Sequence, residues 1–328
     1  MSPNPGPRRP LRGAWALLIA LLLVAGGCAT DIAPTATPES TATDSPSPPP
    51  TAAPSPSPTP TPTPSPTPTS TPRPTLTPLP TPTVADGPDL AGVGVRHCPG
   101  PVAVGAQGKV GSELSSNWSG YAITAGRPVV TCVESEWVQP KVKCHGSTHS
   151  SVSIWVGLGG FNQSRLEQIG TAIDCVSGFP LAYTWHESLP RERHEIDSPV
   201  PVDPGDRIWA QVRWLSGNTY QLSLANLSHP DGFTVKDTNK GLQRTEGEWI
   251  AEAPTSCSPS CHVLPMPSWG KITFDHIGVT IAGVRSTLMA NGSTRVRVRL
   301  VSRSGTARAV VTSTATDGAS FVVTWRHS

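Results

Sequence analysis

The sequence predicts an all-β fold, a β-sandwich of two antiparallel sheets, for the part of the chain from residue 86 onward. Short stretches in which apolar and polar residues alternate recur in this part, such as "SIWVGLGG", "RIWAQVRWL" and "TRVRVRLVS". Glycine, asparagine, aspartate and proline separate these stretches, and no long stretch after residue 86 has a helical period. Many short strands joined by turns are typical of a sandwich in one domain.

Residues 1 to 28 are predicted to be an export signal. Three arginines precede an apolar run from Ala14 to Ala25, which is shorter than the roughly 20 residues of a membrane span. The end of this segment, "LLLVAGGC", resembles a bacterial lipobox, in which Cys28 becomes a lipid-modified N-terminus. Simple secretion with cleavage nearby is the alternative. We therefore expect an extracytoplasmic protein, secreted or anchored to the outer face of the cell membrane as a lipoprotein.

Residues 29 to 85 are predicted to be a disordered linker. The chain has 38 prolines, and 19 of them lie between Pro34 and Pro82, interleaved with threonine and serine. Such a composition favours an extended polyproline spacer and cannot form a packed core. Residues 86 to 328 are thus expected to be the single globular domain.

The overall charge and composition exclude some partners. Charged residues make up 15% of the chain and the formal net charge is +2, so no field that collects nucleic acid is expected. His145 and His149 in "HGSTH" would share a metal only on a helix, and this stretch is predicted to be a loop. We expect no metal, no cofactor and a monomer.

The cysteines agree with an exported domain. Apart from Cys28 there are six, an even number, at Cys98, Cys132, Cys144, Cys175, Cys257 and Cys261. Short spacings favour Cys132 with Cys144 and Cys257 with Cys261, which leaves Cys98 for Cys175, although six cysteines allow 15 connectivities. A zinc site at "CSPSCH" is a competing interpretation, but no second cysteine pair with zinc spacing supports it.

Seven short motifs occur in the order and spacing of a known peptidase family. They are "SNWSGY", "WVGLGG", "LEQIG", "WHESLP", "PGDRI", "ANLS" and "GEWIAE", and the common hydrolase signatures G-x-S-x-G and H-E-x-x-H are missing. The chain resembles the glutamic peptidases, also called eqolisins or peptidase family G1, over about residues 115 to 328. The resemblance implies a concanavalin-like sandwich, a polypeptide substrate and activity at acidic pH.

The resemblance also implies the catalytic residues, which map onto Gln168 and Glu248. Side-chain alternation along "TEGEWIAE" places Glu246, Glu248 and Glu252 on one face of a strand. Neighbouring carboxylates and Trp249 would raise the pKa of Glu248.

These two residue types suit amide hydrolysis. A glutamate can take a proton from water and return it to the leaving nitrogen, as general base and then general acid. A glutamine carries one acceptor and two donors, so it can orient that water and stabilise the oxyanion. Trp155 and Trp185 are expected to shape a wall for substrate, with a core role as the alternative, and Glu187 to bind substrate or hold the polar network.

Two other functions remain open from the sequence. A carbohydrate- or cell-wall-binding module is one, because the same sandwich serves lectins and a Pro/Thr linker often presents binding domains. A glycosidase that uses two carboxylates, Glu248 with Glu187, is the other. The presence of both Gln168 and Glu248 favours the acid endopeptidase.

Overall fold

A computed structural model describes residues 96–328 of the chain, apart from 104, 106–107, 147, 192–193, 196–199, 230 and 258–259. The predicted export signal, Cys28 and the linker lie outside the described residues. Within the described part the regular structure is β-strand, and no helix there is long and apolar enough to cross a membrane. The strands are β1 Lys109–Ser115, β2 Trp118–Thr124, β3 Val130–Val138, β4 Ser150–Gly159, β5 Leu166–Val176, β6 Phe179–Leu189, β7 His194–Glu195, β8 Arg207–Ser216, β9 Thr219–Asn226, β10 Asp231–Thr238, β11 Glu246–Glu252, β12 Thr255–Cys257, β13 Cys261–Val263, β14 Lys271–Ile281, β15 Val284–Ser286, β16 Thr294–Val301, β17 Ala307–Val311 and β18 Phe321–Trp325.

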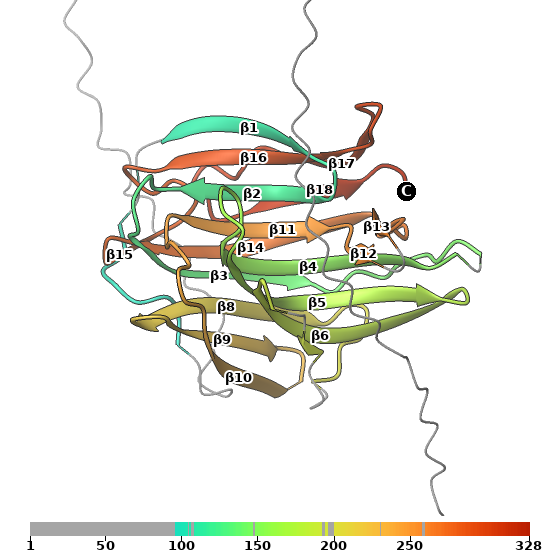
Figure 1. Ribbon diagram of the computed structural model, residues 1–328, viewed down its shortest axis with the longest axis horizontal. Helices are drawn as coiled ribbons and strands as arrows, with labels where there is room; N and C mark the ends of the chain where they lie inside the picture. The colour runs from blue at the N-terminus through green and yellow to red at the C-terminus, as the bar shows by residue number, and fades with distance from the viewer. Residues whose placement is uncertain are drawn as a thin grey trace, which may run out of the picture. The chain divides into compact units, whose positions relative to one another are not determined.

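The predicted β-sandwich is confirmed, and its two layers are continuous along one edge (Figure 1). The first layer has the strand order β10, β9, β8, β3, β14, β18, β17, and the second has the order β16, β2, β11, β4, β5, β6, β7. Strands β16 and β17 pair with each other and so join the layers. Contacts of β3 with β4 and of β5 with β8 and β9 show that the layers face each other.

The main apolar core fills the space between the layers. Trp137 and Phe274 contribute from the first layer, and Ile154 and Trp249 from the second. Because side chains alternate along a strand, neighbouring residues such as Trp155 point to the outer face of the second layer, where a smaller buried cluster forms. This outer face positions the candidate site.

One pairing departs from the predicted antiparallel sheets. β1 pairs parallel with β16, in register from Lys109 opposite Thr294 to Ser115 opposite Leu300. Parallel neighbours need a long connection, and here almost the whole sandwich separates the two strands in sequence. β1 is therefore an added edge of the second layer, next to β16.

All six cysteines of the domain form disulfides, but two of the three predicted pairings are wrong. Cys98 pairs with Cys132 and Cys144 pairs with Cys175, while the predicted bond between Cys257 and Cys261 is present. The last bond closes the β12–β13 hairpin, in which the two cysteines lie opposite each other, and this excludes the zinc interpretation of "CSPSCH".

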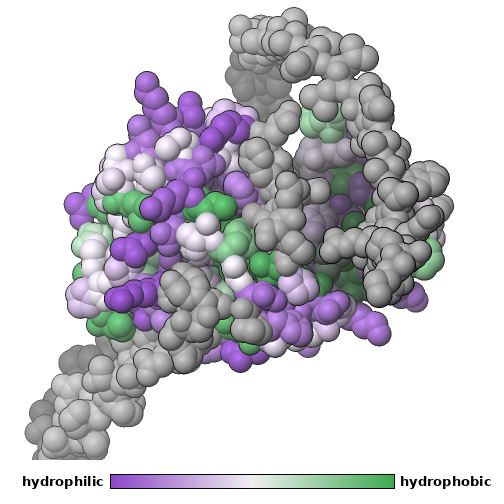
Figure 2. Space-filling model, turned by 90° about the horizontal axis from the view of Figure 1, so that it is seen from below, coloured by the Kyte–Doolittle hydropathy of each residue, from purple (hydrophilic) through white to green (hydrophobic). Residues whose placement is uncertain are grey.

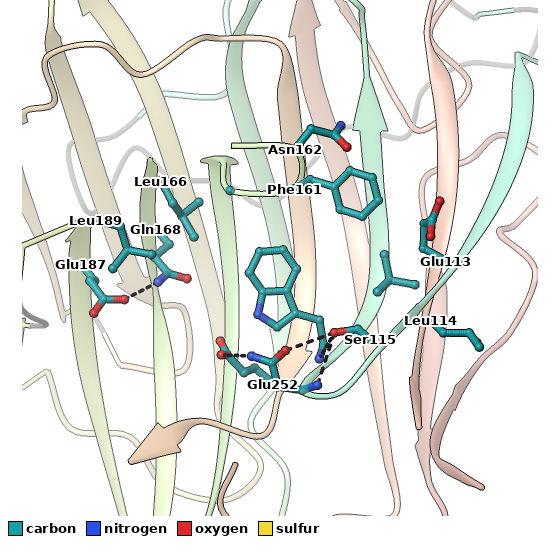
Figure 3. Close-up of a pocket in the computed structure, with 14 residues that line it drawn as sticks. Glu113, Leu114, Ser115, Phe161, Asn162, Leu166, Gln168, Glu187, Leu189 and Glu252 are labelled. Atoms are coloured by element: carbon teal, nitrogen blue, oxygen red, sulfur yellow. Dashed lines mark hydrogen bonds between the residues drawn. The ribbon is translucent and has the colours of Figure 1, made fainter. Parts of the chain in front are cut away.

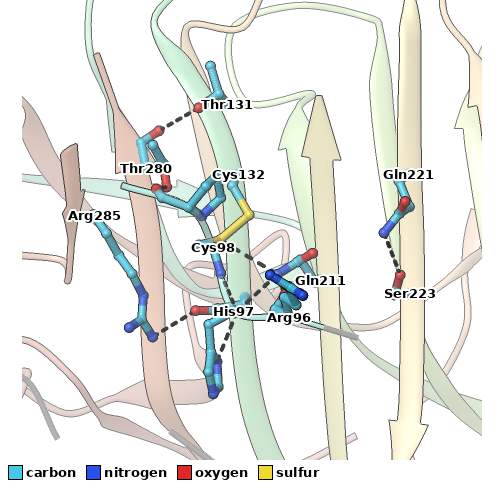
Figure 4. Close-up of a disulfide and its surroundings, with 12 residues drawn as sticks. Arg96, His97, Cys98, Thr131, Cys132, Gln211, Gln221, Ser223, Thr280 and Arg285 are labelled. Atoms are coloured by element: carbon cyan, nitrogen blue, oxygen red, sulfur yellow. Dashed lines mark hydrogen bonds and ion pairs between the residues drawn. A yellow bond between two sulfur atoms is a disulfide. The ribbon is translucent and has the colours of Figure 1, made fainter. Parts of the chain in front are cut away.

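The Cys98–Cys132 disulfide fastens the segment before β1 to the first layer (Figure 4). Beside it, the fully buried carboxylate of Glu134 accepts hydrogen bonds from the backbone N–H of Cys98, from Gln211 Nε2 and from Arg285 Nη2, at 3.0, 3.0 and 2.9 Å. A buried charge is tolerated only with such partners. The residues upstream of β1 are thus held by a covalent bond and a satisfied polar network.

The surface is of mixed character. On the face shown in Figure 2, hydrophilic and hydrophobic residues are interspersed among the coloured atoms. Apolar atoms make up a large share of any folded protein's surface, so single exposed apolar residues there need no special explanation.

Candidate active site

The outer face of the second layer carries the residues that the sequence singles out. Glu248 of β11 lies opposite Gly157 of β4, which lies opposite Gln168 of β5, which lies opposite Glu187 of β6. At Gly157 the space for a side chain is already occupied, because an added Cβ would lie 2.8 Å from Cδ1 of Leu166. Leu166 therefore lies between the Glu248 end and the Gln168 end of this row.

An open groove of about 550 Å³ crosses this face (Figure 3). Gln168, Glu187 and Leu189 line one end of it, and residues of β1 line the other end. Glu252 lies between the two ends in Figure 3, and Trp118 also lines the groove. The full lining consists of Glu113, Leu114, Ser115, Asn117, Trp118, Gly160, Phe161, Asn162, Leu166, Gln168, Glu187, Leu189, Glu252 and Val298.

Gln168 is held at the groove through its amide nitrogen. Its Nε2 donates a hydrogen bond of 2.5 Å to Oε2 of Glu187, the residue directly across from it on β6. Its Oε1 is buried and accepts no hydrogen bond from the described residues. An amide with a fixed nitrogen and an unpaired oxygen is poised to accept a hydrogen bond from a water molecule in the groove.

Glu252 is the residue of β11 whose carboxylate lines the groove. Trp155 Nε1 donates to Oε2 at 2.8 Å and Asn117 Nδ2 donates to Oε1 at 3.0 Å. Asn117 is itself held by Ser115, whose Oγ donates to Asn117 Oδ1 at 3.1 Å. Trp118 packs edge-to-face against Trp155, with ring centroids 5.0 Å apart. Two donors thus fix the position of the Glu252 carboxylate.

Glu248 lies outside the groove, which corrects its predicted place in the site. Its side chain is 0% exposed, neither carboxyl oxygen has a hydrogen-bond partner among the described residues, and it is not a lining residue. Burial, and secondarily the neighbouring charge of Glu246, raises the pKa of Glu248 well above its ordinary value. The pKa rises in the predicted direction, but a carboxyl closed off from solvent has no access to a substrate.

The segment that follows β4 packs near the position of Glu248. Ala122 lies directly opposite Glu248 on β2, and Phe161 packs on the small cluster formed by Ala122, Val296 and Val298. Phe161 also lines the groove. The face that bears Glu246, Glu248 and Glu252 is therefore open at the Glu252 end and closed at Glu248.

The aromatic residues divide differently from the prediction. Trp155 and Trp185 are 0% and 2% exposed and pack together with Ile250 beneath the groove. Neither lines the groove, so the core alternative holds for both, although Trp155 also contacts Glu252. Glu187 does line the groove, and its role there stays a prediction.

The sequence reasoning missed Glu252, Asn117 and Trp118. Two signals for them were available. "SNWSGY" contains Asn117 and Trp118, and Glu252 lies on the same predicted strand face as Glu248. In the structure Trp118 pairs directly with Glu252 across β2 and β11, which brings the two motifs together.

Neither Glu167 nor a metal-binding cluster of the described residues lies at the groove. Glu167, next to Gln168 in sequence, is fully buried, and its carboxyl accepts a hydrogen bond from Ser188 rather than facing the groove. Among the described residues no three His, Cys, Asp or Glu side chains are grouped so as to hold a metal ion.

Comparison with known proteins finds relatives of this chain in sequence and in fold. The model of the peptidase A4 family matches residues 116–325, more than half of the chain. The fold is similar to scytalido-glutamic peptidase, solved with a transition-state analogue inhibitor, at 21% identity and a TM-score of 0.56 over 65% of this chain and 99% of that one. It is also similar to SCP-B, a member of the eqolisin family of peptidases solved with the tripeptide Ala-Ile-His, at 20% identity and a TM-score of 0.53 over the same shares.

The identity of about 20% to these two solved structures shows a shared fold. No curated protein matches the sequence. The family match rests on the sequence itself and spans the strands that form the groove, from β2 to β18. The chain therefore belongs to the peptidase A4 family, the glutamic peptidases that its motifs resemble.

Proposed function

We propose that the protein is an extracytoplasmic acid endopeptidase in which Glu252 and Gln168 act on either side of one water molecule. The observation that carries the proposal is that both side chains line the same groove, each fixed by hydrogen bonds to its own partners. Glu248, which the sequence motif suggested, has no exposure. The dyad is therefore assigned to Glu252 with Gln168.

The proposed reaction needs no group beyond these residues and water. The Glu252 carboxylate takes a proton from water as the water oxygen attacks the carbonyl carbon of the peptide bond. The unpaired Oε1 of Gln168 orients the water, and its second N–H, the one not donated to Glu187, faces the developing oxyanion. When the C–N bond breaks, Glu252 returns the proton to the leaving nitrogen.

The surrounding residues hold the two acting side chains in place. Trp155 and Asn117 each donate a hydrogen bond to one carboxyl oxygen of Glu252. Glu187 acts as a positioning residue, because its carboxylate holds the amide nitrogen of Gln168. Trp155 is likewise a positioning residue for Glu252, and Trp185 supports it from below.

The proposed location outside the cytoplasm is supported by the disulfide bonds. The three disulfides of the domain are typical of proteins from an oxidising compartment outside the cytoplasm. Attachment to the membrane through a lipid on Cys28, the disordered linker and the monomeric state stay proposals. The proposed partner at the groove is an extended polypeptide.

The test is digestion of denatured casein or haemoglobin by the full-length protein between about pH 2 and 7. Gln168→Ala and Glu252→Gln are each expected to lower kcat by about 100-fold or more, because each removes a group that acts on the reacting atoms. Glu248→Gln is the matched control. It makes the same substitution four residues earlier on the same face of β11, and it should leave cleavage in place. Loss of cleavage in Glu248→Gln, with Glu252→Gln active, would return the role to Glu248.

The same set of variants separates the alternatives. A glycosidase that uses Glu248 and Glu187 is disfavoured, because Glu248 is closed off from the groove. Parallel digestion of oligosaccharides tests this directly. Absence of proteolysis at every pH, together with binding to a glycan, would support the carbohydrate-binding alternative instead.

A further inference from the structure

The far wall of the groove is built by a strand that the family match does not include. The match begins at residue 116, whereas β1 spans Lys109–Ser115. Glu113, Leu114 and Ser115 of β1 nevertheless line the groove, at the end opposite Gln168 and Glu187 (Figure 3). This wall is thus an addition to the part of the domain that the family match covers.

β1 is held in place at both ends. It keeps continuous parallel register with β16 over its whole length. After it, Ser115 Oγ accepts a hydrogen bond from the backbone N–H of Trp118 at 3.0 Å and fixes the turn into β2. Before it, Ala103 donates its backbone N–H to Arg285 at 2.9 Å, and Cys98 is bonded to Cys132. A side chain on β1 therefore has a defined position relative to the groove.

Glu113 is the charged residue on this wall. It pairs in register with Val298, which also lines the groove, and neighbouring positions in paired strands face the same side. Its side chain is exposed and makes no hydrogen bond or ion pair with the described residues. The Glu113 carboxylate is thus available to a bound ligand.

The charge of the whole groove has one sign. Its charged lining residues are Glu113, Glu187 and Glu252, and the lining contains no lysine, arginine or histidine. The Glu187 carboxylate accepts a hydrogen bond from Gln168. The Glu252 carboxylate accepts hydrogen bonds from Trp155 and Asn117. Glu113 is the acid whose charge is left for the substrate.

We propose that Glu113 is a specificity-determining residue that favours lysine or arginine at a substrate position remote from the cleaved bond. An extended polypeptide that reaches from Gln168 and Glu252 to β1 places one of its side chains beside Glu113. A basic side chain there forms an exposed ion pair, for which a two- to fivefold gain in kcat/KM is expected, or about 0.4 to 1 kcal/mol. This inference rests on the proposed peptidase function.

The test uses internally quenched peptides in which a single lysine is moved through an otherwise neutral sequence, with alanine at the same position as the reference. For the full-length wild type, lysine at one position should raise kcat/KM two- to fivefold, mainly through KM, because the contact is equal in ground state and transition state. The gain should shrink when NaCl is raised from about 0.05 to 1 M, since exposed ion pairs are screened.

Variants at Glu113 identify the residue responsible. Glu113→Gln should bring the lysine-to-alanine ratio at that position close to one, and Glu113→Asp should restore it. Glu113→Lys should invert the preference toward glutamate. Asp231→Asn is the matched control, because it removes the same charge from an exposed position on β10, the edge strand of the first layer, and should keep the full preference.

The outcomes separate the two proposals. Cleavage by the wild type without a lysine preference at any position, or a preference that Glu113→Gln retains in full, overturns the role of Glu113 and leaves the peptidase function standing. A preference that falls equally in Asp231→Asn is an effect of net charge and also overturns it. If the wild type cleaves none of the peptides or the denatured proteins, the peptidase function fails and the specificity role fails with it.

Discussion

The indole Nε1 of Trp155 donates a hydrogen bond of 2.8 Å to Oε2 of Glu252, across the neighbouring strands β4 and β11. A residue buried in the cluster beneath the groove thereby orients the carboxylate that opens into it. The interaction is charge-assisted, and such hydrogen bonds are about twice as strong as those between neutral groups.

Trp155→Phe removes this donor and keeps most of the ring that packs against Trp118. We expect kcat/KM to fall about tenfold, the cost of one hydrogen bond to a charged group. The loss should fall on kcat with KM nearly unchanged, because the general base loses its fixed position while the substrate contacts remain. Trp185→Phe makes the same change in the same cluster and should leave kcat near the wild-type value; an equal loss in both variants would assign the effect to packing.

Glu167 predicts a pH dependence of stability. Burial, opposed by the hydrogen bond from Ser188, raises the pKa of Glu167 from 4.5 to about 7. Between these two values the folded state holds a proton that the unfolded state releases, so the free energy of unfolding falls as pH rises through this window, by on the order of 3 kcal/mol. Glu167→Gln should remove this slope.

Urea unfolding with the disulfides intact, compared at about pH 4 and about pH 8, measures the effect of Glu167→Gln. The variant should match the wild type at the lower pH and exceed it at the higher one. Asp231→Asn should leave the wild-type slope unchanged. An unaltered slope in Glu167→Gln would show that another group titrates in this range.

Gly170, within the "LEQIG" motif, is predicted to tolerate no side chain. An added Cβ would lie 2.0 Å from the carbonyl oxygen of Ile154 and 2.7 Å from Cβ of Trp155. Gly170→Ala should therefore destabilise the domain by about 1 to 3 kcal/mol and displace Trp155, with a loss of activity. Gly111→Ala is the control, because on β1 the nearest atom to an added Cβ is Val296 Cγ2 at 3.4 Å, an ordinary contact. Equal stability of both variants would contradict the packing described for β4 and β5.

The disulfides should differ in their contribution to stability. Cys98 and Cys132 are 34 residues apart in sequence and Cys257 and Cys261 only 4. In the chain-entropy model, replacing the first pair by serine should cost roughly 4 kcal/mol and replacing the second roughly 2 kcal/mol. Chemical denaturation of the two double variants measures both costs, and the reverse order would refute the entropic account.

The sequence predicted the fold because the evidence for it is local. Alternation in stretches such as "RIWAQVRWL" and turn residues between them specify strands, and residues such as Trp209 and Trp249 were bound to be buried. The parallel pairing of β1 was not predictable, since an alternating stretch carries no information on the direction of its neighbour.

The alternation of side chains along the strand could not show whether Glu248 or Glu252 lines the groove. Period-two alternation places both on one face but does not say which part of that face another segment covers. Here Phe161, from the segment after β4, packs beside the Glu248 position and leaves Glu252 open. Gln168 and Glu187 lie together at the groove because adjacent strands of a hairpin carry them in register.

The disulfide pairing failed for a related reason. Proximity in sequence favoured Cys132 with Cys144, yet Cys132 lies within β3, which continues to Val138. Six residues of extended strand cover roughly 20 Å, so these two cysteines are carried apart. Cys144 is instead near Cys175, because Ser150 at the start of β4 pairs with that residue.

The bond between Cys98 and Cys132 also decides what a nick in the backbone does to the molecule. Cys98 precedes β1 and Cys132 lies in β3, so a single cut anywhere between them leaves the two pieces covalently joined. The strand that carries Glu113 would survive such damage with its neighbours. A segment upstream of Cys98 is released only by a cut before that residue, or by a cut between the two cysteines followed by reduction of the disulfide.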